Sequence, residues 1–166
     1  MGIEFHAKVS GSIEIAADPE VVFGMVTDLP RMGEWSPENQ GGAWQGGATE
    51  AAIGARFLGN NVNGRKKWSV GVKVTELDAP TRFAFGTIWY GMTIARWSYD
   101  IARTSTGCTV TESWEDLRPA FAAWLLGKKI TSVHDRATFT RHSIDTTLAN
   151  LKASAEQLSD RRPRVS

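Results

Sequence analysis

The sequence has little cysteine and little histidine, and this excludes several kinds of site. Cys108 is the only cysteine, so no intramolecular disulfide and no cysteine-based metal or redox centre can form. The three histidines lie far apart, and no carboxylate–histidine spacing matches a common metal site. We therefore expect no metal ion, and a single cysteine is easiest to reconcile with a reduced, cytoplasmic compartment.

Motifs for common catalytic and cofactor-binding sites are also missing. The chain has no Gly-x-Ser-x-Gly elbow, no phosphate-binding loop and no GxGxxG pattern. The paired glycines at 41–42 and 46–47 lack a strand-to-helix context, so they are interpreted as turns. We expect no bound cofactor, and no residue is assigned as catalytic.

The chain has little excess charge and no long apolar run. Its formal net charge is +1, which gives no broad attraction to nucleic acid or anionic lipid. No apolar run approaches the roughly 18 residues of a membrane-spanning helix, and the first residues do not resemble a signal peptide. We expect no nucleic-acid partner, no stable membrane insertion and a cytoplasmic location, with a monomer and a homodimer both left open.

What is present fits one globular domain. The chain has 166 residues, of which 42% are hydrophobic and 22% charged, enough to bury a core. We expect a single domain over residues 1–160. The three arginines around Pro163 predict a basic, disordered tail at 161–166.

Alternation of apolar and polar residues predicts strands along most of the chain. The clearest run is 68–75, and Asn63-Gly64 before it is a strong hairpin signal. The turns between the runs are short, so the sheet should be an antiparallel meander. The expected strands are 7–16, 42–45, 54–61, 68–75, 82–88, 93–103 and 108–114.

Helices are predicted at two places. Asp18-Pro19 is a helix start that predicts a short helix over 19–27, followed by a second short turn at 31–34. From Ile130, apolar residues recur at spacings of three and four for nearly 30 residues, and only Arg141 interrupts the series. Such a helix is roughly 40 Å long, so its apolar stripe must lie on the sheet.

This order of elements resembles the START-like superfamily, which includes polyketide cyclases/dehydratases, birch-pollen-type ligand carriers and lipid-transfer domains. The similarity is greatest to the bacterial polyketide cyclase/dehydratase-like subgroup, and it covers about residues 5–158. It is specific for fold and weak for function. The segments that carry it are 17–23, 26–28, 35–38, 53–57, 59–61, 97–99, 107–113 and 147–152.

The resemblance implies an α+β helix-grip fold. A curved antiparallel seven-stranded sheet wraps around the long C-terminal helix, with two short helices after the first strand. It also implies a cavity between sheet and helix, and the seven tryptophans support this because large rings leave gaps when packed. We expect at least about 300 Å³, the low end of ligand pockets. By strand phase, the predicted lining includes Trp68, Phe85, Trp97, Tyr99 and Trp114.

Glu112 is the leading candidate for a functional residue. It falls in phase with Val110 and Trp114, so alternation points it inward, unless a bulge turns it to solvent. An inward carboxyl group needs a partner or must hold its proton, and its pKa rises if the site is dry and unpaired. We expect Glu112→Gln to change the affinity for a polar-headed ligand by at least about tenfold.

The long helix offers two possible partners for Glu112. His134 and Arg141 are seven residues apart, so they lie on nearly the same face, although Arg141 can also extend along its stem to the surface. Before the helix lie the apolar residues Phe121, Trp124, Leu125 and Leu126, and three interpretations stay open: a lid over the cavity, an interface, or an ordinary amphipathic connector.

Three functions remain open. The first is a carrier or sensor that binds a hydrophobic or aromatic small molecule, lipid-like or polyketide-like, without turnover. The second is a cyclase- or dehydratase-type enzyme that uses polar groups in the cavity. The third is a protein-binding module like the chaperone-activator branch, which predicts a shallow or filled core and an exposed apolar patch. The few inward polar residues favour binding.

Overall fold

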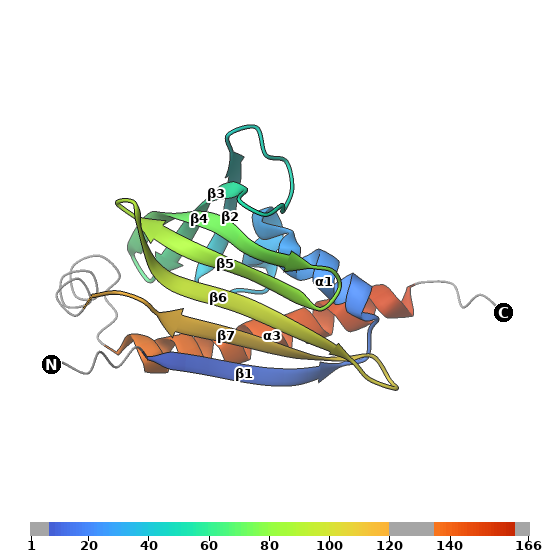
Figure 1. Cartoon of the computed structure of the whole chain (residues 1–166). Helices are drawn as coiled ribbons and strands as arrows, with labels where there is room; N and C mark the ends of the chain where they lie inside the picture. The colour runs from blue at the N-terminus through green and yellow to red at the C-terminus, as the bar shows by residue number, and fades with distance from the viewer. Residues whose placement is uncertain (1–6, 120–134, 162–166) are drawn as a thin grey trace, which may run out of the picture.

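The computed structural model describes residues 7–119 and 135–161 (Figure 1). A curved sheet wraps against one long helix, as the predicted α+β helix-grip fold requires. The elements are β1 (Lys8–Ile15), α1 (Pro19–Thr27), the 3-10 helix η1 (Leu29–Glu34), β2 (Asn39–Gln45), β3 (Arg56–Asn63), β4 (Lys66–Asp78), β5 (Arg82–Trp89), β6 (Met92–Arg103), β7 (Cys108–Asp116) and α3 (Arg136–Asp160).

In the described part of the chain, seven strands form one antiparallel sheet in the order β1-β7-β6-β5-β4-β3-β2. From β2 to β7 the sheet is the predicted meander. The sequence predicted the first strand but not its position in the sheet. It pairs with the last strand, so that Gly11 lies opposite Glu112. Figure 1 shows β1 and β7 lying along α3, while β2, β3 and β4 curve away from it.

The helix α3 packs its predicted apolar stripe on the sheet. It begins after Asp135, whose side chain accepts a hydrogen bond from the Thr138 backbone N–H at 3.1 Å. Ile144, Leu148 and Leu151 are buried, which confirms that part of the stripe. The start expected at 130 lies outside the described residues, and no helix within 7–119 or 135–161 has the length and apolar character to cross a membrane.

Close packing of α3 depends on Gly11 of β1. A Cβ atom at this position would lie 3.0 Å from Cγ2 of Ile144 and 3.5 Å from Cδ1 of Leu148. The missing side chain lets Ile144 and Leu148 of α3 pack directly against β1, at the position beside Glu112 in the sheet.

The segment after η1 is fixed against α3 by Trp35. This side chain is fully buried, and its Nε1–H donates to Sδ of Met32 at 3.1 Å. The side-chain amide of Asn150 on α3 donates to the Trp35 carbonyl oxygen at 3.0 Å. Trp35 is thereby held near the middle of α3, and Glu38, three residues later, pairs with Arg136 at the start of the helix.

Candidate functional site

A pocket lies between the inner face of the sheet and α3, with η1 and the segment after it on one side. Its volume is about 190 Å³. The expectation of at least about 300 Å³ is therefore wrong for the described residues, because several indole rings project into the space between the layers. The pocket is still larger than a 150 Å³ cavity that accommodates benzene.

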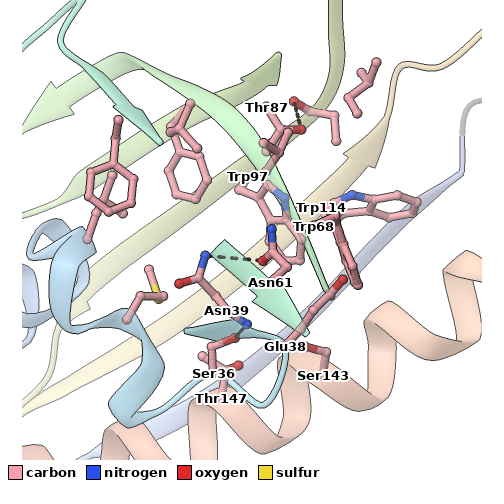
Figure 2. A pocket seen from close by; sticks show the side chains of 18 of the residues that line it. Ser36, Glu38, Asn39, Asn61, Trp68, Thr87, Trp97, Trp114, Ser143 and Thr147 are labelled. Atoms are coloured by element: carbon pink, nitrogen blue, oxygen red, sulfur yellow. Dashed lines mark hydrogen bonds between the residues drawn. The ribbon is translucent and has the colours of Figure 1, made fainter. Parts of the chain in front are cut away.

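The wall on the sheet side is aromatic. Trp97 of β6 lies directly opposite both Phe85 of β5 and Trp114 of β7 in the strand register, and the two indole centroids are 6.5 Å apart. Figure 2 shows Trp68, Trp97 and Trp114 around the same space. The aromatic residues that line the pocket, besides Tyr99, are Phe57, Trp68, Phe85, Trp89, Trp97 and Trp114.

The wall on the helix side carries small polar residues. Ser143 and Thr147 of α3 are buried and line the pocket opposite the tryptophans (Figure 2). Asn39, at the start of β2, donates from its side-chain amide nitrogen to Oδ1 of Asn61 on β3 at 3.4 Å, and both residues also line the pocket. The pocket therefore has an apolar side and a polar side, an arrangement typical of ligand sites.

Glu112 lies inward, as the strand phase predicted, and it is only 3% exposed. The Tyr99 hydroxyl group, directly opposite on β6, donates to Oε1 of Glu112 at 2.8 Å. The second oxygen, Oε2, is buried and has no hydrogen-bond partner among the described residues. A buried polar atom without a partner is uncommon and calls for an explanation.

The environment of Glu112 favours its neutral form. Burial raises the pKa of Glu112 to about 8, although the hydrogen bond from Tyr99 acts in the opposite direction. Burial and the adjacent carboxyl group also raise the pKa of Tyr99 well above its ordinary value. At neutral pH, Glu112 is therefore mostly a carboxylic acid that can donate a hydrogen bond.

Two arginines line the pocket, and a carboxylate engages each of them. The guanidinium group of Arg136 donates from both terminal nitrogens to the two oxygens of Glu38, each at 2.9 Å. Arg118 donates to Asp116 from Nε at 2.8 Å and from a terminal nitrogen at 2.6 Å. These two-pronged pairs are the strong form of the arginine–carboxylate contact.

Six of the eight predicted ligand-binding residues come together in this pocket. They are Trp68, Phe85, Trp97, Tyr99, Glu112 and Trp114.

The two predicted helix partners of Glu112 are not among them. Arg141 is exposed, so its assignment to the site is corrected: the buried face of α3 includes Thr140, Ser143 and Thr147, and Arg141 points away from it. His134 and the segment 121–126 lie outside the described residues, as does the predicted tail after Arg161.

The sequence reasoning missed the polar side of the pocket. Ser143 and Thr147 share the three-four spacing of Ile144 and Leu148, which was a usable signal for a mixed buried face. Glu38 and Arg136 are 98 residues apart, and no local pattern links them. Among the residues the structure describes, no cluster of three metal-ligating side chains occurs.

Solved structures with the same fold have low sequence identity to this chain. A Polyketide_cyc-like protein from Corynebacterium glutamicum is 24% identical, with a TM-score of 0.65, and the match covers 99% of this chain and 100% of that one. The di-domain ARO/CYC protein StfQ of the steffimycin biosynthetic pathway is 12% identical, with a TM-score of 0.71, over 93% of this chain and 52% of that one. Major latex-like protein 151 from Panax ginseng is 15% identical, with a TM-score of 0.63, over 90% and 97%.

These likenesses show the fold. None of the curated proteins matches the chain significantly. The family model described as "Polyketide cyclase / dehydrase and lipid transport" matches residues 6–156, which include every element from β1 to most of α3. The helix-grip architecture and this match support a ligand-binding role, and the chain belongs to the polyketide cyclase/dehydrase and lipid transport family.

Proposed function

We propose that the protein is a carrier or sensor that holds a hydrophobic, aromatic small molecule in the pocket between the sheet and α3. The observation that carries the proposal is the pocket itself: aromatic rings of β3 to β7 surround a space of about 190 Å³, with the carboxyl group of Glu112 buried among them. A ligand of one or two rings matches this volume, whereas a long fatty-acid chain does not.

The apolar walls supply the driving force for such binding. Removal of apolar surface from water contributes roughly 25 cal/mol per Å², and stacking on indole rings adds to it. The polar residues on the α3 side and Glu112 would orient the ligand rather than hold it. The lipid-transport part of the family description agrees with a role in binding without turnover.

A second candidate function is catalysis of the cyclase or dehydratase type. The observation that favours it is Glu112, because a carboxylic acid with a pKa of about 8 is suited to proton transfer near neutral pH. Among the described residues, Tyr99 is the hydrogen-bond partner of Glu112, and no nucleophile or oxyanion site of recognisable geometry includes this pair. We therefore place binding before turnover.

A protein-binding role is less well supported. It predicts a shallow or filled core and an exposed apolar patch, but the large exposed hydrophobic residues in the described ranges are scattered over several elements. They are Ile53, Leu58, Tyr90, Met92 and Leu158.

Native mass spectrometry of the purified protein tests the binding proposal. We expect to detect a small molecule that stays bound to the protein under non-denaturing conditions and is released when the protein unfolds. Val70→Trp places an indole in the pocket, because Val70 lines it, and this variant should carry less ligand. Lys73→Trp is the matched control, since Lys73 lies on the same strand and is exposed. Equal loading of the two variants would contradict a site in this pocket.

A further inference from the structure

We propose that the pocket selects an uncharged ligand that bears a hydrogen-bond acceptor, such as an aryl ketone, and discriminates against carboxylates of the same size. This inference rests on the proposed function and names its ligand class. Two independent observations carry it: the orientation of the Glu112 carboxyl group, and the pairing of both arginines in the lining.

The hydrogen bond from Tyr99 engages Oε1 of Glu112 and leaves Oε2 without a partner among the described residues. The Tyr99 hydroxyl group donates to Oε1, so Oε1 acts as the carbonyl oxygen of a neutral carboxyl group. The proton then sits on Oε2, which is buried in the pocket lining and has no partner among the described residues. A buried donor without an acceptor is unfavourable, and a ligand that supplies a hydrogen-bond acceptor removes this cost.

The groups around Glu112 keep it neutral. On β6, the residue opposite is Tyr99, and on β1 it is Gly11, which has no side chain. On α3, the polar residues that line the pocket are Ser143 and Thr147, which do not titrate, and Arg136, which is paired with Glu38. From β4 and β5 the lining is apolar or hydroxylic, and among the described residues no cation contacts the carboxyl group to stabilise its ionised form.

The arginines that line the pocket are already neutralised. Arg136 forms its two-pronged pair with Glu38, and Arg118 forms another with Asp116. All four side chains are at least four-fifths buried, so these contacts are poorly screened by solvent. Within residues 7–119 and 135–161, an anionic ligand would have to break one of these pairs or enter without a counter-charge, and both are unfavourable.

Three two-ring probes of similar size separate these contributions by isothermal titration calorimetry at pH 6. They are α-tetralone, which has a ketone oxygen, tetralin, which has no polar atom, and α-naphthoate, which is an anion. We expect α-tetralone to bind at least tenfold more tightly than tetralin, and α-naphthoate to bind at least tenfold more weakly than α-tetralone. Equal or tighter binding of α-naphthoate would overturn the inference.

Glu112 variants assign the ketone preference to its carboxyl group. Glu112→Leu should remove the preference for α-tetralone over tetralin. In the native protein, α-tetralone should lose about tenfold in affinity between pH 6 and pH 10, because burial holds the pKa of Glu112 near 8. Glu112→Gln, which cannot titrate, should bind α-tetralone equally at both pH values. Glu115→Gln is the control. Glu115 lies on the same strand but forms an ion pair with Arg96, and this variant should keep the native pH dependence.

The outcomes distinguish the two proposals. If tetralin binds but α-tetralone binds no more tightly, or if Glu112→Leu still binds α-tetralone more tightly than tetralin, the proposed ligand class is wrong. The proposal of a binding pocket is not affected by that result. If none of the three probes binds the native protein, the proposed function falls, and the inference falls with it. Circular dichroism checks that each variant is folded, and if Glu112→Leu is not, Glu112→Gln and the native pH dependence still decide.

Discussion

The hydroxyl group of Tyr99 on β6 donates a 2.8 Å hydrogen bond to Oε1 of Glu112, its direct cross-strand partner on β7. The two side chains lie on the inner face of the sheet and are almost completely buried. One oxygen of the carboxyl group is thereby fixed, and the other is left for the pocket. This pair is the structural basis of the pH dependence expected for both stability and binding.

Stability should fall as pH rises from about 4.5 to about 8, through the contribution of Glu112. The folded protein holds a proton at Glu112 up to a pKa of about 8, whereas the unfolded chain releases it near the ordinary value of 4.5. In that window the folded state binds more protons than the unfolded state, so deprotonation favours unfolding. The shift corresponds to a destabilisation of up to roughly 5 kcal/mol.

Urea denaturation of the native protein and Glu112→Gln at several pH values measures this contribution, because other titrating groups cancel in the difference. The free energies of unfolding should differ least near pH 4.5. The variant should become the more stable of the two by a few kcal/mol above pH 8. A difference that does not change with pH would show that Glu112 is not held neutral.

Leu148→Ala should destabilise the protein by about 2–5 kcal/mol. Leu148 is 2% exposed and packs behind Gly11 of β1, so truncation leaves a cavity where helix and sheet are closest. Leu158→Ala on the same helix is the control, since Leu158 is 44% exposed and should matter far less. Similar denaturation midpoints for the two variants would contradict the packing of α3 described above.

The pair formed by Glu38 and Arg136 should be needed to hold the start of α3 on the segment after η1. Arg136→Ala leaves the Glu38 carboxylate buried without its partner, and we expect a loss of about 3 kcal/mol in the free energy of unfolding. Combining Glu38→Gln with Arg136→Met removes both charges and should cost less than the single change.

A solvent-exposed pair serves as the comparison for this prediction. Arg103 contacts Glu20 with both side chains 59% exposed, so Arg103→Ala should change stability by no more than about 1 kcal/mol. Equal effects of Arg103→Ala and Arg136→Ala in the same urea melts would show that burial adds nothing to the second pair.

Much of the fold could be predicted because strand phase is a local property. Alternation in β7 placed Val110, Glu112 and Trp114 on one face, and the structure has all three buried. The pairing of β1 with β7 could not be read in the same way. It joins residues about 100 positions apart, and no turn fixes its register.

The site was predictable only on its sheet side. Arg141 was assigned to the pocket because it interrupts an apolar series, but its position on α3 points to solvent, and the small residues Ser143 and Thr147 take the inner face. The buried state of Glu112 also revises the expectation for Glu112→Gln. An amide mimics a neutral acid, so the tenfold change expected for this variant should appear only above pH 8, where native Glu112 is ionised.

Binding of tetralin to the native protein, measured by calorimetry beside Val70→Trp and Lys73→Trp, tests the central claim most directly. Tetralin has no polar atom, so it reports on the pocket alone. The account predicts saturable one-to-one binding to the native protein and to Lys73→Trp, and at least tenfold weaker binding to Val70→Trp. No saturable binding to the native protein, or equal binding to both variants, would contradict it.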